Sequence, residues 1–230
     1  MAYISFRGVK SDSLGLMIEK MPSHKRAEVR NTEYEIPGRD GALHIAEGYA
    51  AFDLQATVTA INADAGIRQT VNAWADGTGL LFTSDDTSKC YKASALKEVV
   101  YTRRKYGGKF YDTAKITWRC QPFMVEPAPK VYTFTQSGTI VNLGNMPSLP
   151  LITVTGSGEC AFSIGGQAVT LSGVSSAAPV TLDCEAGYVY TASGAAAMSG
   201  AFPEIPLGSS AVTVGANITQ LKIQGNWRWL

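Results

Sequence analysis

Histidine and cysteine are scarce in this chain of 230 residues, and their scarcity limits the chemistry that it can perform. Its two histidines are His24 and His44, and no serine sits in the G-x-S-x-G sequence that presents a nucleophilic hydroxyl. Four cysteines lie 24 to 40 residues apart without a CxxC pair: Cys90, Cys120, Cys160 and Cys184. We therefore expect no zinc site and four buried, reduced thiols that act as small hydrophobic side chains.

Charge is also scarce, and it is unevenly distributed. Charged residues make up 17% of the chain and the net charge is +1, which gives no indication of binding to nucleic acid or to an anionic membrane. Residues 1–130 carry 18 Lys and Arg against 15 Asp and Glu, whereas residues 131–230 carry 2 against 4. Such different surfaces predict two domains with different roles.

Long hydrophobic runs are missing as well. The uncharged stretch between Lys130 and Glu159 is interrupted by Pro147 and Pro150, so it does not predict a membrane span. The first 16 residues, MAYISFRGVKSDSLGL, contain charges where a secretory signal has its apolar core. We therefore expect synthesis in the cytoplasm and no insertion into a membrane.

The first part of the chain shows strand patterns and one helix pattern. Alternating apolar residues predict strands at 4–6, at 14–18 and most clearly at 52–61. Ile67, Val71 and Trp74 form one apolar stripe, which predicts a helix over about 63–76, capped at its start by Asn62 or Asp64 and covering a sheet. Further strands are predicted at 80–83, 91–96 and 98–104, and Gly107-Gly108 indicates a hairpin.

The remainder of the chain has an all-β pattern. Three prolines in residues 122–130 predict a stiff connection between domains, so we place the boundary between 1–126 and 127–230. Short alternating runs separated by glycines then predict an antiparallel sandwich. Trp227 and Trp229 are expected to pack on its core as alternating residues of a last strand.

The sequence EIPGRDGAL at residues 35–43 invites comparison with a phosphate-binding loop. No Lys-Ser/Thr follows Gly41, and the next segment reads as strand, so this motif fails as such a loop. The residues fit a tight hairpin instead, in which Gly38 and Gly41 supply positive φ and Asp40 can bond its own backbone. Arg39 would then be presented at the tip.

Other candidate sites are equally weak. Asp183 and Glu185 are two residues apart in a predicted strand, and we interpret them as a polar edge or a turn-stabilising pair rather than the carboxylates of a glycosidase. The basic cluster Arg103, Arg104, Lys105 and Lys109 has tyrosines interleaved, which a nucleic-acid arm would also show. A solvated or protein-contacting hairpin is the preferred interpretation, and we predict no catalytic residue, no metal site and no cofactor.

Several stretches together resemble the distal tail proteins (Dit) of long-tailed, non-contractile phages. They cover essentially the whole chain, in the order FRGVKSDSLGLMIEKMP, VRNTEYEIPGRDGAL, NAWADGTGLLFTSDD, NMPSLPLITVTGSG, LDCEAGYVY, GAFPEIPLGSSAVTV and WRWL. The GRDG turn and the FPEIPLG segment are the most specific parts of the resemblance.

The resemblance implies a non-enzymatic structural protein, mainly β. Its N-terminal domain would be a tail-tube-like β-barrel or split sandwich with one helix, and its C-terminal domain a galectin-like β-sandwich. Six copies would form a ring in the virion, at the tail tip, between the major tail (tail tube) protein and the tail-associated, tail fibre or receptor-binding proteins. DNA would pass through without sequence-specific binding.

Two hypotheses about contacts follow from the residues and the resemblance together. Arg39 and Asp40, with the basic hairpin, are candidate interface residues, because rings need heterologous contacts. Arg39 would reach a neighbouring subunit or the tail tube, and the alternative is that it only stabilises its own hairpin. The alternative function is a carbohydrate-binding module that recognises cell-wall sugar through the C-terminal sandwich. We expect most of the few aromatic residues in 131–225 to point inward. The aromatic residues of that region are Tyr132, Phe134, Phe162, Tyr188, Tyr190 and Phe202.

Overall fold

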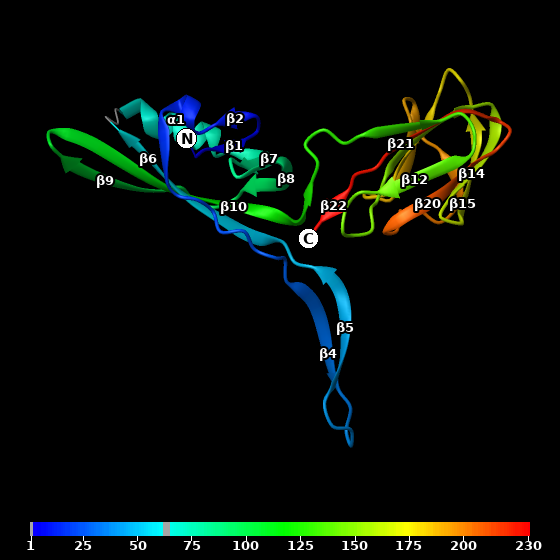
Figure 1. Ribbon diagram of the computed structural model, residues 1–230, viewed down its shortest axis with the longest axis horizontal. Coiled ribbons are helices and arrows are strands. Elements are labelled where there is room, and N and C mark those ends of the chain that lie inside the picture. The colour runs from blue at the N-terminus through cyan, green and yellow to red at the C-terminus, as the bar shows by residue number, and fades with distance from the viewer. Residues whose placement is uncertain (1, 62–64) are drawn as a thin grey trace. The chain divides into compact units, whose positions relative to one another are not determined.

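The computed structural model describes residues 2–61 and 65–230. Its contacts divide the chain into two compact units, one of Met1–Pro127 with Leu230 and one of Ala128–Trp229 (Figure 1). Apart from one turn of 3₁₀-helix, α1 is the one helix among the described residues and the rest of the regular structure is strand. The predicted fold class, mainly β with one helix, is confirmed.

The first unit contains ten strands, a 3₁₀-helix and α1 among its described residues. In chain order they are β1 (Ile4–Phe6), β2 (Val9–Lys10), η1 (Asp12–Leu14), β3 (Leu16–Lys20), β4 (Val29–Glu35), β5 (Ala42–Tyr49), β6 (Phe52–Ile61), α1 (Ala65–Trp74), β7 (Gly77–Thr83), β8 (Asp86–Ala95), β9 (Val100–Tyr106) and β10 (Lys109–Val125). A curled antiparallel sheet has the order β2-β1-β7-β8-β10-β6-β3, and β9 also pairs with β10.

Helix α1 covers one face of this sheet, as its apolar stripe predicts. Val71 and Trp74 are buried and Ile67 packs against the same core, which also contains Leu54 and Trp118. The predicted helix is too long at its end, because α1 stops at Trp74 and the chain enters β7 at 77. The proposed caps at 62 and 64 lie outside the described residues.

Two other predictions for the first unit need correction. The alternation at 14–18 is not one strand, because Gly15 has a left-handed φ of 70° that ends η1 before β3 begins. The stretch 122–130 is not wholly a connection, because β10 runs on to Val125 and includes Pro122. The pairing of β10 with β8 shifts register between Cys120 and Met124, and such an irregularity is where a strand tolerates proline.

The second unit is an antiparallel sandwich of two sheets. Its strands are β11 (Val131–Phe134), β12 (Gly138–Asn142), β13 (Leu151–Gly156), β14 (Gly158–Ile164), β15 (Gln167–Val174), β16 (Val180–Asp183), β17 (Tyr188–Thr191), β18 (Gly194–Ala195), β19 (Ala197–Gly200), β20 (Gly208–Val214) and β21 (Ile218–Gln224). The last strand of the chain, β22 (Arg228–Trp229), belongs to neither of its two sheets. The sheets have the orders β11-β21-β13-β16-β17-β18 and β12-β20-β14-β15-β19. Trp227 is buried in the core between them and Trp229 packs against it, as predicted, but Trp227 precedes the last strand and does not alternate with Trp229 within it.

One glycine of the second unit leads to a stability prediction. A Cβ at Gly156 would collide with the backbone oxygen of Asn217 and lie 2.7 Å from the Sγ of Cys160. Gly156→Ala is therefore expected to lower the free energy of unfolding by about 1–3 kcal/mol, measured by denaturant titration. Gly138→Ala is the control, because the nearest atoms there belong to the movable ring of Phe134. Equal losses in both variants would contradict the argument.

Candidate functional site

The hairpin of β4 and β5 forms a two-stranded sheet separate from the main sheet of its unit (Figure 1). An isolated hairpin in water is only marginally stable, and this one exposes most residues on both faces. Its strands and tip carry large apolar side chains that are open to solvent: Val29, Tyr34, Ile36, Leu43 and Ile45. This surface favours a partner that covers it.

The tip of the hairpin is a tight turn, as its sequence predicts. The N–H of Arg39 donates to the carbonyl of Ile36 over 3.1 Å, with Pro37 and Gly38 between them. Proline followed by a residue at φ 82° is the signature of a type II turn. Gly41 also has positive φ, and the strand β5 follows directly, so this segment is no phosphate loop. Arg39 and Asp40 are exposed beside a hollow at the tip.

The hairpin of β9 and β10 distributes the basic cluster over two faces. Its register pairs Arg103 with Asp112 and Lys105 with Phe110, on the face that α1 covers. Arg104 and Lys109 alternate with them and therefore lie on the other face. The four basic residues thus cannot act as one patch, although all of them remain candidates for contact with a partner.

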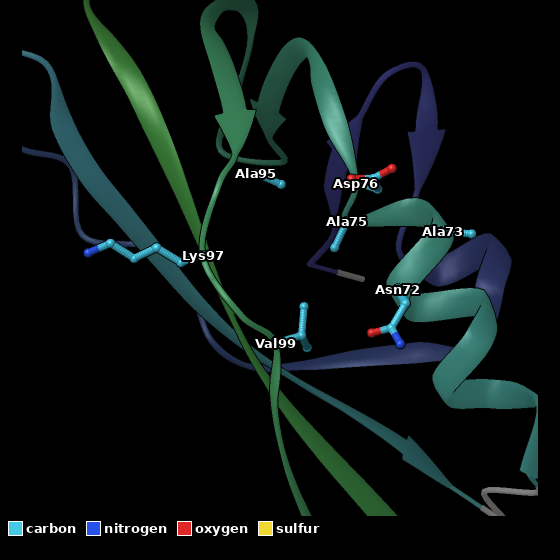
Figure 2. A pocket seen from close by; sticks show the side chains of 7 residues that line it. All are labelled: Asn72, Ala73, Ala75, Asp76, Ala95, Lys97 and Val99. Carbon is cyan, nitrogen blue, oxygen red and sulfur yellow. The ribbon is translucent and has the colours of Figure 1, made fainter.

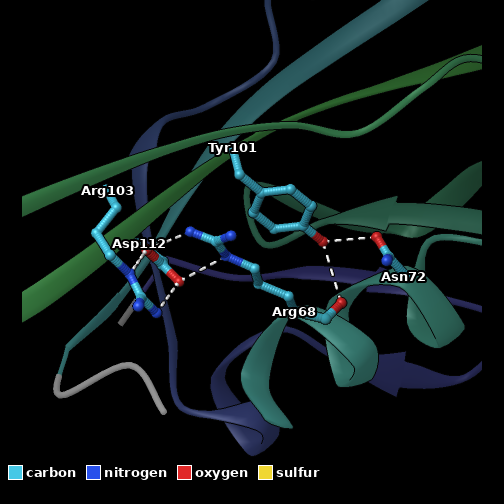
Figure 3. A network of polar contacts seen from close by, with 5 residues as sticks. All are labelled: Arg68, Asn72, Tyr101, Arg103 and Asp112. Carbon is cyan, nitrogen blue, oxygen red and sulfur yellow. Dashed lines mark hydrogen bonds and ion pairs between the residues drawn. The ribbon is translucent and has the colours of Figure 1, made fainter. Parts of the chain in front are cut away.

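Asp112 is the centre of a polar network (Figure 3). Its side chain is only 2% exposed, and it accepts hydrogen bonds from Arg103 at 2.7 and 2.8 Å and from Arg68 at 2.9 and 3.2 Å. These two guanidinium groups, Arg103 first, lower the pKa of the Asp112 carboxyl to about 2. Arg103 is therefore held within its own chain, which leaves its role at an interface a hypothesis.

Tyr101 links the same hairpin to the helix. Its hydroxyl donates to the Asn72 Oδ1 at 2.7 Å and lies 3.1 Å from the backbone carbonyl of Arg68 (Figure 3). The hairpin is thus fixed to α1 by one tyrosine and one bridging carboxylate. Register alone could have indicated the pairing of Arg103 with Asp112, since two strands joined by Gly107-Gly108 align these positions. Arg68 carried no comparable signal.

A hollow lies at the end of α1 (Figure 2). It has a volume of about 390 Å³ and is lined by Asn72, Ala73, Ala75, Asp76, Ala95, Lys97 and Val99. The ammonium group of Lys97 is bound to Asp53 at 2.5 Å, and the backbone carbonyl of Asp76 accepts from Arg7. These polar groups are committed to the fold, and their arrangement resembles no acid–base pair.

The histidines and the paired carboxylates have structural partners. His24 Nε2 is 2.7 Å from Asp85, and His44 lies in the β4–β5 hairpin, 4.0 Å from Glu33. Asp183 accepts the N–H groups of Glu185 and Ala186, which confirms the turn-stabilising interpretation. Glu185, however, lies in the turn after β16 and not in a strand.

The four cysteines are buried and free, as predicted. Burial raises the pKa of Cys90 to about 11 and the pKa values of Cys120 and Cys184 to about 12. Across residues 2–61 and 65–230, no three His, Cys, Asp or Glu side chains gather in a way that could bind a metal. The helix found in those ranges also falls short of the length and apolar character that a membrane span requires.

Comparison with solved structures shows which known fold this architecture shares. The Dit protein (gp 19.1) of phage SPP1, a paradigm of the hub adsorption apparatus in phages that infect Gram-positive bacteria, superposes with a TM-score of 0.73 at 13% sequence identity. The match covers 97% of this chain and 98% of that chain. The chain has the Dit fold. The Dit likeness extends through both units, because a match of this coverage leaves neither out.

Two further likenesses are weaker. The structure of the phage P2 baseplate in its activated conformation with Ca matches at a TM-score of 0.47 and 8% identity, over 97% of both chains. The structure of the same baseplate with Sr matches at a TM-score of 0.44 and 8% identity, over 99% of both chains. No protein-family model matches the sequence, and a search of curated proteins gives no significant match.

Proposed function

We propose that this protein is a structural hub of a phage tail and not an enzyme. Six copies would form a ring in the virion, at the tail tip, with the tail tube protein on one side and tail-associated or receptor-binding proteins on the other. The observation that carries the proposal is the correspondence with SPP1 Dit over 97% of the chain. That protein is described as a hub, and a hub needs surfaces for several partners.

The two hairpins of the first unit supply surfaces of the kind that a ring requires. The β4–β5 hairpin exposes apolar side chains together with charges of both signs, among them Glu33, Glu35 and Arg39. The β9–β10 hairpin exposes Arg104, Lys105 and Lys109. Apolar and charged groups on two different parts of one chain suit a head-to-tail contact between copies, and such contacts close into rings when the rotation permits.

The mass of the purified protein in solution tests the proposal. Six copies of the 24.5 kDa chain would scatter light as a particle of about 147 kDa and appear in negative stain as rings with a central hole. If the protein alone is monomeric, the same measurement is repeated with the tail tube protein of the same phage. Failure to form rings in both conditions would contradict the hub proposal.

Arg39→Ala is expected to weaken the ring without unfolding the monomer. Arg39 is exposed at the turn, so its removal leaves the fold intact and removes one charged contact per interface. Dilution series should show rings dissociating at a protein concentration about tenfold higher than for the wild type. Arg26→Ala removes another exposed arginine of the same unit and serves as the control. Equal ring stability in all three proteins would refute the role of Arg39.

A further inference from the structure

Two tyrosines of the second unit lie on the solvent face of a sheet. Tyr188 and Tyr190 are two apart in β17, with Val189 between them packed on the core. Their ring centroids are 5.2 Å apart and the ring planes differ by 31°, so the two rings pack against each other. Tyr188 is nevertheless 51% exposed. They are exceptions to the expectation that most aromatic residues of this unit point inward.

Cross-strand register extends this face over five strands. Tyr190 stands opposite Thr181 and Tyr188 opposite Asp183. Continuing through β13, β21 and β11, one row contains Thr133, Lys222, Thr153, Thr181 and Tyr190, and the next contains Val131, Gln224, Leu151, Asp183 and Tyr188. Strands are about 4.8 Å apart, so each row is about 19 Å long. We call these ten residues the tyrosine band.

Most side chains of the tyrosine band are hydroxyl, amide or charged groups. Thr153 and Thr181 share a hydrogen bond of 3.3 Å, and Asp183 is fixed by the two N–H groups of its turn. Fixed polar groups lose little freedom when a ligand binds. The apolar members are Leu151 and Val131, too few for the hydrophobic centre of a large protein interface.

We propose that the tyrosine band binds a neutral saccharide chain, with a pyranose ring packed on Tyr188. The face of an aromatic ring is electron-rich and attracts the weakly positive C–H groups of a sugar ring. The sugar hydroxyls would then bond with the Thr hydroxyls, Asp183 and Lys222. One positive and one negative charge in the band balance, which favours a neutral ligand over a polyanion. This inference goes beyond the hub function, and a single copy suffices for it.

The band is an open surface, so the affinity of one copy is expected to be weak. Saturation-transfer NMR detects weak, rapidly exchanging ligands, and the probes are cellopentaose, chitopentaose and mannopentaose with the full chain. We expect saturation transfer to at least one probe. Tyr188→Ala should reduce it about fivefold or more, since stacking on an aromatic ring contributes about 1 kcal/mol.

The controls separate recognition from folding. Tyr106→Ala removes a tyrosine that is 81% exposed in the first unit, and it should bind like the wild type. Lys222→Ala keeps both tyrosines and should also reduce transfer, because it removes a group that bonds with the sugar hydroxyls. Unchanged melting of each variant establishes that the sandwich is intact. Absence of transfer to all three probes, or full transfer in Tyr188→Ala, would overturn the proposal, whether or not the protein forms rings.

Discussion

Trp118→Ala is expected to lower the free energy of unfolding of the first unit by about 3–5 kcal/mol. Trp118 is fully buried in β10 and its ring packs against Phe6 and Trp74, with centroids 5.9 and 5.8 Å away. These contacts join the sheet to the helix that covers it, so truncation leaves a large cavity where the elements meet. Calorimetry should show one early transition for the first unit and an unchanged transition for the second.

Trp118→Phe refines this prediction. The indole Nε1 of Trp118 has no hydrogen-bond partner among the described residues, and a buried N–H without an acceptor costs free energy. Phenylalanine fills most of the space and removes that donor, so it should destabilise far less than alanine. Phe110→Ala, at an exposed position of the same strand, is the control and should cost less than about 1 kcal/mol. A loss this small in Trp118→Ala would contradict the assignment of this core.

Asp112→Asn is expected to destabilise the first unit by about 2 kcal/mol. The substitution keeps the size of the side chain but removes the charge that receives the hydrogen bonds of Arg103 and Arg68. Denaturant titration at pH 7 measures the loss. Asp40→Asn alters an exposed carboxylate at the hairpin tip and should leave the stability nearly unchanged. A similar small effect in both variants would mean that the network contributes little.

The same carboxylate predicts a dependence of stability on pH. Folding lowers the pKa of Asp112 from 3.8 to about 2, so the folded state binds its proton less readily than the unfolded state. The contribution of Asp112 is therefore complete above pH 4 and declines as the pH falls from about 4 to 2. Asp112→Asn should lack this component of acid destabilisation. The prediction would be contradicted if the free energies of unfolding of the wild type and the variant fell by the same amount between about pH 4 and pH 2.

Periodicity in the sequence was sufficient for elements whose contacts are local or regular. The stripe of Ile67, Val71 and Trp74 predicted which side of α1 faces the core, because an amphipathic helix can bury only one face. The paired glycines predicted the β9–β10 turn because a two-residue turn needs positive φ and joins two neighbouring antiparallel strands.

Contacts between segments far apart in the sequence could not be predicted from its periodicity. Nothing near Arg68 indicates that its partner is Asp112, 44 residues later. The separation of β4 and β5 from the main sheet was also unpredicted, since their alternation resembles that of any strand. The outward position of Tyr188 depends on the register in which β17 pairs with β16. In that register Tyr188 stands opposite Asp183.

The buried thiols have a consequence for how the protein responds to oxidants. Each cysteine is enclosed by its own unit, and for at least three the raised pKa leaves almost no thiolate at neutral pH. Oxidants and disulfide exchange act on the thiolate, so transfer of the folded protein into aerated buffer is expected to leave its covalent structure unchanged. The new thiol of Arg39→Cys, exposed at the hairpin tip, could therefore be labelled selectively while the four buried cysteines stay unreacted.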